Sequence, residues 1–177
     1  MGCWAMGVMD SDDSMDIESL IQQVMEVVLG ISQEEMLAVV ALHDEFGPES
    51  AEFLKARMVA HEGIVAKMND PVVQFRVMFD VMTAASNELG VEGGECLQVI
   101  GAVFMAMGIA IVPDIMCRIV EAARNDAWAK TEPARKAAMD AFIAILGSYD
   151  GKTQTHVAST GLFDAIASTL GEMRTTH

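Results

Sequence analysis

The densest group of potential metal-binding oxygens in the sequence lies in the segment Asp10–Glu18, where acids alternate with other residues. Alternating oxygen ligands are typical of calcium-binding loops, which also need glycine at the sixth position and a bidentate Glu at the twelfth. Counted from Asp10, the sixth residue is Met15 and the twelfth is Ile21. Because both positions carry apolar residues, the segment is interpreted instead as the acidic start of a helix, where negative charge is favourable.

A second acidic group follows on the next predicted helix. It is similar to the acidic cluster of the all-helical nucleotide pyrophosphohydrolases, which hold magnesium between two such clusters on successive helices. The helix after it carries its acids in a different arrangement, so neither a metal nor another cofactor is expected. If a metal binds, the predicted ligands are Glu34, Glu35, Asp44 and Glu45.

A glycine-lysine-threonine sequence and a histidine could each suggest catalysis, but neither predicts a catalytic residue. Gly151-Lys152-Thr153 is preceded by Gly147, which leaves three intervening residues where a phosphate-binding loop needs four, and it follows a helical pattern instead of a strand. His61 falls on an apolar helical stripe, which favours a hydrogen-bonded core residue.

The net charge of −15 is distributed unevenly. Twelve acids precede the first basic residue, Lys55, so residues 1–54 carry −12 of the total. This charge disfavours direct binding to nucleic acid or an anionic membrane and fits a partner protein with a basic surface. A device for solubility is the alternative interpretation. The predicted contact residues are the acids of the opening segment and two adaptable methionines: Asp10, Asp12, Asp13, Asp16, Glu18, Met9 and Met15.

Apolar residues recur at helical spacing through nearly the whole chain, and no segment predicts a strand. The pattern predicts an all-α protein with one domain, 1–177, in which residues 1–10 anchor the N-terminus and 11–54 form a strongly acidic helical third. The expected architecture is a single irregular bundle of seven or eight helices around an apolar central helix. Helices are expected near 11–30, 32–46, 48–68, 71–89, 96–112, 113–128, 133–147 and 162–173.

The predicted central helix lies in Cys96–Pro113, eighteen residues without a charge. This length reaches the lower limit for a membrane span. The polar Gln98 and the acids at both ends favour a buried helix instead. Gly101 and Gly108 are predicted to share one face and to allow a neighbouring helix to approach closely. The three cysteines have unrelated spacings and no signal peptide precedes them, which predicts a reduced, cytoplasmic protein.

The opening, MGCWAMGVMDSDDSMD, resembles that of a bacterial and phage domain family of unknown function, whose members begin MGxWGxGxFDSDxAxD. Ala5, Met9 and Ser14 depart from the pattern. The resemblance implies a small cytoplasmic helical domain with no known activity to transfer, and the phage setting favours an inhibitor or immunity role. The matching residues are Met1, Gly2, Trp4, Gly7, Asp10, Ser11, Asp12 and Asp16.

Gly2, Trp4 and Gly7 are predicted to act as a structural anchor, because glycine permits tight turns and tryptophan supplies a large apolar group. The sequence therefore predicts a non-enzymatic protein-binding domain, of the phage-encoded inhibitor or immunity type, that presents an acidic surface to a basic partner surface. Two alternatives stay open at this point. One is a metal-dependent hydrolase of small phosphorylated substrates, and the other is a homo-oligomeric helical scaffold.

Overall fold

The computed structural model describes residues 7–9, 11–32 and 51–157, and these ranges contain helices and no strand, as predicted for an all-α protein. The predicted helices over 32–46 and 162–173 lie outside the described residues. The described part therefore holds six α-helices, not the seven or eight expected of the whole chain. The elements are α1 (Asp12–Leu29), α3 (Ala51–Met68), α4 (Pro71–Ala84), the π-helical turn η2 (Ala85–Leu89), α5 (Gly93–Met107), α6 (Pro113–Arg124), the 3₁₀ turn η3 (Trp128–Lys130) and α7 (Pro133–Ser148).

Helix α1 begins and ends as its sequence predicts. The Ser11 hydroxyl accepts a hydrogen bond from the Ser14 N–H at 3.0 Å, and the Ser14 hydroxyl oxygen accepts one from the Ser11 N–H at 3.1 Å. This reciprocal pair satisfies two of the amides at the start of the helix. Gly30 ends the helix in the left-handed conformation, with φ of 63°. The last turn of α1 contains no base, but Lys67 from α3 donates to the Leu29 carbonyl at 3.1 Å.

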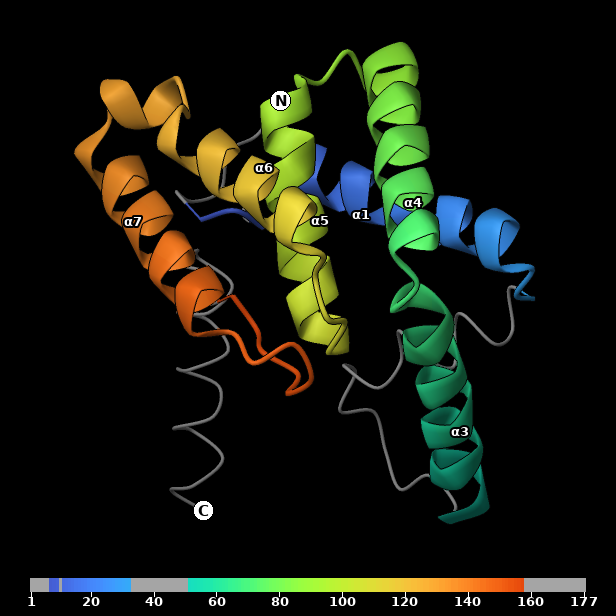
Figure 1. Cartoon of the computed structure of the whole chain (residues 1–177). Coiled ribbons are helices and arrows are strands. Elements are labelled where there is room, and N and C mark those ends of the chain that lie inside the picture. Colours follow the sequence, from blue (N-terminus) through green and yellow to red (C-terminus); the bar gives the residue numbers. More distant parts are fainter. Residues whose placement is uncertain (1–6, 10, 33–50, 158–177) are drawn as a thin grey trace, which may run out of the picture.

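Helix α5 is the centre of the described bundle. It lies between α4 on one side and α6 and α7 on the other, and α1 crosses behind it (Figure 1). Nine of its fifteen residues are buried. A Cβ atom at Gly101 would lie 2.8 Å from Cγ2 of Ile119 on α6. The predicted close approach at Gly101 is therefore confirmed, because only glycine leaves room for α6 here.

The central helix is shorter at its C-terminal end than predicted. It ends at Gly108, whose φ of 76° is left-handed, and the residues that follow up to 112 are not helical. Gly108 therefore ends α5 and does not extend the face that Gly101 presents. The buried Ile109 continues the apolar run, which explains the wrong boundary, since hydrophobicity alone does not separate a helix from a buried extended segment. No helix in the described ranges is long and apolar enough to cross a membrane.

The prediction of one helix over 113–128 is also wrong at its C-terminal end. Helix α6 stops at Arg124, and Trp128 opens the separate turn η3. The reason is Asp126, whose Oδ1 accepts a hydrogen bond from the Ala129 N–H at 2.8 Å. A short acidic side chain that bonds the backbone three residues ahead competes with helix continuation and favours a turn. This turn forms one side of the candidate site.

Candidate functional site

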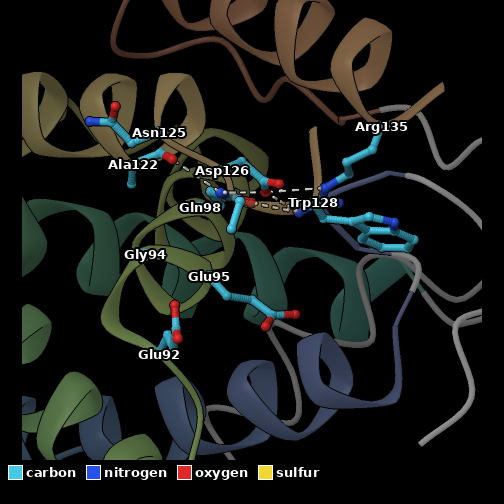
Figure 2. A pocket seen from close by; sticks show the side chains of 10 residues that line it. Glu92, Gly94, Glu95, Gln98, Ala122, Asn125, Asp126, Trp128 and Arg135 are labelled. Atoms are coloured by element: carbon cyan, nitrogen blue, oxygen red, sulfur yellow. Dashed lines mark hydrogen bonds and ion pairs between the residues drawn. The ribbon is translucent and has the colours of Figure 1, made fainter. Parts of the chain in front are cut away.

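A hollow of about 280 Å³ opens between the N-terminal end of α5 and the connection from α6 to α7. Figure 2 shows Glu92, which precedes α5, and Glu95 of α5 on one side of it and Asn125 and Asp126 on the other. Its lining carries three carboxylates and one guanidinium, so negative charge is in excess when all four groups are ionised. The lining includes the charged, amide and aromatic side chains of Glu92, Glu95, Gln98, Asp126, Trp128 and Arg135.

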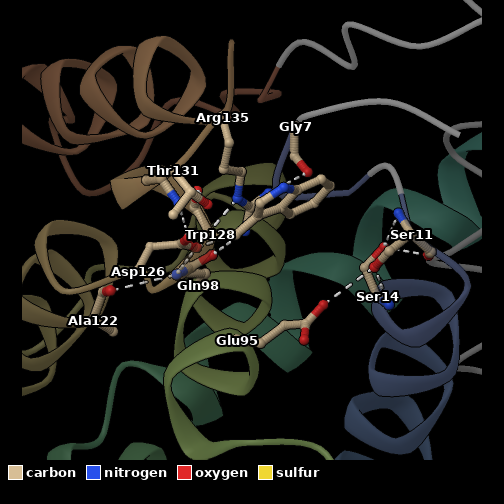
Figure 3. Close-up of polar contacts among 11 residues, drawn as sticks. Gly7, Ser11, Ser14, Glu95, Gln98, Ala122, Asp126, Trp128, Thr131 and Arg135 are labelled. Atoms are coloured by element: carbon tan, nitrogen blue, oxygen red, sulfur yellow. Dashed lines mark hydrogen bonds and ion pairs between the residues drawn. The ribbon is translucent and has the colours of Figure 1, made fainter. Parts of the chain in front are cut away.

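Arg135 is the buried base of this site, and its guanidinium is held from several directions (Figure 3). Nη2 donates to Asp126 Oδ2 at 2.9 Å and to Gln98 Oε1 at 2.8 Å, and Nε donates to Asp126 Oδ2 at 3.2 Å. Nη1 donates to the Gly7 carbonyl at 2.8 Å. The side chains of Arg135 and Asp126 are only 7% and 8% exposed, so this is a buried ion pair with satisfied hydrogen bonds.

Local sequence explains how this network is positioned. Arg135 shares the inward stripe of α7 with Met139, Phe142 and Leu146, at spacings of four, three and four residues. The first turn of α7 is set by Glu132, whose Oε1 accepts from the Ala134 N–H at 3.3 Å. Arginine is therefore directed into the core by the helix it occupies, toward the turn that carries Asp126.

Trp128 completes this side of the site. The Arg135 guanidinium carbon lies 5.3 Å from the centre of the indole ring, within the distance for a cation–π contact. The side chain is 37% exposed, so the contact with Arg135 leaves part of the indole open to solvent. Trp128 is thus the large aromatic group of the hollow's lining.

The pKa of Asp126 lies below its ordinary value. Burial acts to raise it, but hydrogen bonds from Arg135, the Ala129 N–H and Gln98 outweigh burial, and the charge of Arg135 adds to them. The carboxylate therefore stays ionised, and its charge is used inside the protein. Asp126 therefore stabilises the wall of the hollow, and its charge is paired with that of Arg135.

Glu95 on the other side is in the opposite situation. Burial raises its pKa and a hydrogen bond from Ser11 partly offsets this. The negative charge of Asp13 raises it further, and the smaller effects of the Arg135 and Asp126 charges have opposite signs. The Ser11 hydroxyl donates to Glu95 Oε1 at 3.2 Å. Among the described residues no Lys or Arg lies within ion-pair distance of Glu95 or Glu92. Arg135 thus bonds Asp126 directly but acts on Glu95 only through its charge.

The structure divides the predicted contact residues among different directions. On α1, Asp12, Met15 and Asp16 are exposed and share the outward face, and Met15 is 63% exposed. Asp13 is half-buried on the side toward Glu95. Glu18 is half-buried as well, and burial raises its pKa.

The five helical positions therefore do not form one face. Asp13 and Glu18 are five residues apart, which places them about 140° apart around a helix of 3.6 residues per turn. Met9 is half-buried against the core, whereas Asp10 lies outside the described residues. Of the predicted set, Asp13 is the residue whose charge acts on Glu95 in the lining of the hollow.

The predicted anchor is described at one residue. Gly7 is buried, and its carbonyl accepts the Arg135 hydrogen bond, while Val8 beside it is only 4% exposed. Gly2 and Trp4 lie outside the described residues. The predicted metal ligands Glu34, Glu35, Asp44 and Glu45 lie outside them too. Within the described ranges, no group of three or more His, Cys, Asp or Glu residues is placed to hold a metal ion.

A second hollow lies beside His61, near the C-terminal end of α5. His61 is half-buried, and its Nε2 lies 2.8 Å from the Met107 carbonyl, so the predicted hydrogen bond is present. Gln154 lies 3.3 Å from the same nitrogen. The lining also holds Glu62 and Lys152, which carry opposite charges, and this hollow selects neither anions nor cations.

Several site residues were not recognised in the sequence: Glu92, Glu95, Asp126, Trp128 and Arg135. For Arg135 a signal existed, because an arginine on the apolar stripe of a helix needs a buried partner. In the sequence Gln98 is a polar residue in an apolar run, and in the structure it bonds both members of the ion pair. Glu95 carries no such signal, since the residue it meets is 84 positions away.

In comparisons with known proteins, no protein-family model matches the chain, and neither a curated protein nor a solved structure matches it. The likeness of the opening residues to the bacterial and phage family stays a prediction. Function is therefore argued from the geometry and charge of the site.

Proposed function

We propose that this protein is a non-enzymatic protein-binding domain that presents its acidic side to a basic surface of another protein. The observation that carries the proposal is the meeting of acids from separate segments at one place. Ser11 at the start of α1 bonds Glu95 of α5, and the charge of Asp13 acts on that same carboxylate. Asp13 therefore acts on Glu95 of α5, and the exposed Asp12 and Asp16 lie on the outward face of the same helix as Asp13. Asp12, Asp13, Asp16, Glu92 and Glu95 together are called the acidic side.

The composition of this side favours an interface over a reaction centre. An exposed methionine, Met15, lies between the exposed carboxylates Asp12 and Asp16, and methionine adapts to irregular partner surfaces. Exposed carboxylates attract a positively charged partner and speed its association. A cytoplasmic location and an inhibitor or immunity role of phage origin belong to the same proposal and follow from the sequence alone.

The test compares two charge-matched double variants of the tagged chain in affinity capture from bacterial cells. D12N/D16N neutralises one first-turn acid and one exposed second-turn acid of α1. D114N/E62Q neutralises a first-turn acid of α6 and an exposed acid of α3. Each of the two variants therefore loses two negative charges. Each captured protein is purified and titrated against all three chains at 50 and 300 mM salt.

We expect D12N/D16N to weaken binding about tenfold and D114N/E62Q to change it less than about twofold, because only the first pair belongs to the acidic side. Higher salt should weaken binding of the unchanged chain strongly, since exposed charges are screened. Equal binding by both variants, affinity that does not depend on salt, or capture no greater than that of the bare matrix would contradict the proposal.

One observation favours a second candidate function, self-association. Val72 and Phe79 on α4 are 75% and 52% exposed, and the ring of Phe79 packs against that of Phe75 with centroids 6.5 Å apart. An apolar group of this kind is common at interfaces between copies of a chain. We expect that if a dimer forms, F79S returns it to monomer in sedimentation; a monomer at all concentrations for the unchanged chain excludes this candidate.

A further inference from the structure

We infer that the hollow beside Trp128 is the receptor for one arginine side chain of the basic partner. The inference rests on the proposed function and adds the chemical group recognised and the place where it is bound. It rests on three observations: the hollow itself, the exposed Trp128 in its lining, and the contact between the Arg135 guanidinium and the Trp128 ring (Figure 2).

The size of the hollow suits one side chain. At about 280 Å³ it lies just below the range of about 300–1,000 Å³ that is typical of pockets for drug-sized ligands. It opens to the surface next to the acidic side, so a partner docked on α1 can extend a side chain into it. Central pockets that receive a single anchor residue commonly supply much of the binding energy of an interface.

The charges left in the hollow select a cation. Asp126 is neutralised by Arg135 through hydrogen bonds of 2.9 and 3.2 Å from two guanidinium nitrogens, so this pair adds little net charge. Glu92 and Glu95 have no base of the described residues at ion-pair distance, and Arg135 acts on Glu95 only through its charge. Glu92 is the extended N-cap residue of α5 and Glu95 lies in its first turn, and both line the hollow.

Arginine fits this lining better than lysine does. A planar guanidinium can donate to two carboxylate groups at once, and it also stacks on aromatic rings. The same combination exists inside the site, where the Arg135 guanidinium bonds a carboxylate and lies over the Trp128 ring. Trp128 is 37% exposed despite that contact, which leaves indole surface for a second guanidinium.

The test uses the capped tripeptides Ac-Gly-Arg-Gly-NH₂, Ac-Gly-Lys-Gly-NH₂ and the citrulline analogue of the first, titrated into the full isotope-labelled chain. The readout is the indole N–H resonance of Trp128, distinguished from that of Trp4 by its absence in W128F. We expect a saturable shift with the arginine peptide, at least threefold weaker binding of the lysine peptide, and no shift with citrulline, which has the shape without the charge.

Two charge-matched variants complete the test. E92Q/E95Q should lower the affinity for the arginine peptide at least fivefold and keep a native spectrum, whereas D114N/E62Q should leave it unchanged. No saturable shift at Trp128, or equal shifts with arginine and citrulline, would overturn the inference. If the peptide fails while D12N/D16N still weakens partner binding, the acidic side binds without this receptor; if the peptide binds while partner binding ignores salt, the receptor stands and the proposed function fails.

Discussion

Asp126 and Glu95 line the same hollow, yet the side formed by α6, η3 and α7 gives its carboxylate a base, whereas the side formed by α1 and α5 gives its carboxylate another acid nearby. The first arrangement makes a satisfied, buried pair. The second leaves a half-buried carboxylate at a cost in stability. Groups that cost stability in the folded protein are expected where binding is needed. The side with Asp126 is therefore interpreted as structural and the side with Glu95 as the binding side.

The largest effect on stability is expected from a substitution of Arg135. R135M leaves Asp126 as an uncompensated buried charge and removes the hydrogen bond to the Gly7 carbonyl. We expect a loss of about 3–5 kcal/mol in the free energy of unfolding, measured by urea titration at neutral pH. A loss below about 1 kcal/mol would show that this side is no more structural than the other.

Two controls accompany R135M. D126N/R135M should recover much of the loss, because it removes the unpaired charge and keeps the oxygen that accepts the Ala129 hydrogen bond. K136A breaks an exposed pair with Asp140, in which both side chains are more than 60% exposed, and should change stability by about 0.5 kcal/mol or less.

The effect of R135M also has a pH dependence with a definite sign. The pKa of Asp126 is lowered in the folded protein, so its contribution to stability is complete above the unfolded pKa and disappears as the pH falls through the folded pKa. Below that value Asp126 is protonated with or without Arg135. The difference in stability between the unchanged chain and R135M should therefore narrow under acid conditions.

The two sides of the hollow also differ in how far the sequence predicts them. Ser11 and Gly30 predict the limits of α1, and apolar spacing predicts the inward face of α7, because these features depend on neighbours within one helix. Arg135 lies on the same stripe, but apolar spacing alone does not include it. The partner of Arg135 is not predictable in this way. Asp126 lies in a turn, and its position depends on how α6 packs against α7.

Contacts across the bundle were the least predictable. Glu95 meets the start of α1 only because α1 crosses α5, and no local pattern links positions 84 residues apart. Gly108 shows the same limit within one segment. Its left-handed conformation ends α5 inside an uninterrupted apolar run, where hydrophobic spacing predicts a longer helix.

The smallest effect on stability is expected from a substitution of Glu95. It distinguishes the two sides of the hollow clearly, because its sign is opposite to that of R135M. The pKa of Glu95 is raised in the folded protein, so between the ordinary and the raised value the folded chain binds more protons than the unfolded chain. Stability therefore falls as the pH rises through this window and stays lower above it. E95Q removes the charge and keeps an oxygen that can accept the Ser11 hydrogen bond.

We expect E95Q to raise the melting temperature at pH 7 by about 1–2 °C, a small gain because solvent screens a half-exposed side chain. The gain should vanish below the unfolded pKa, where Glu95 is protonated in the unchanged chain as well. E88Q, an exposed position on η2, serves as the control and should leave the melting temperature unchanged. If E95Q instead lowers the melting temperature, Glu95 is a structural carboxylate like Asp126, and the acidic side loses the feature that marks it for a cationic partner.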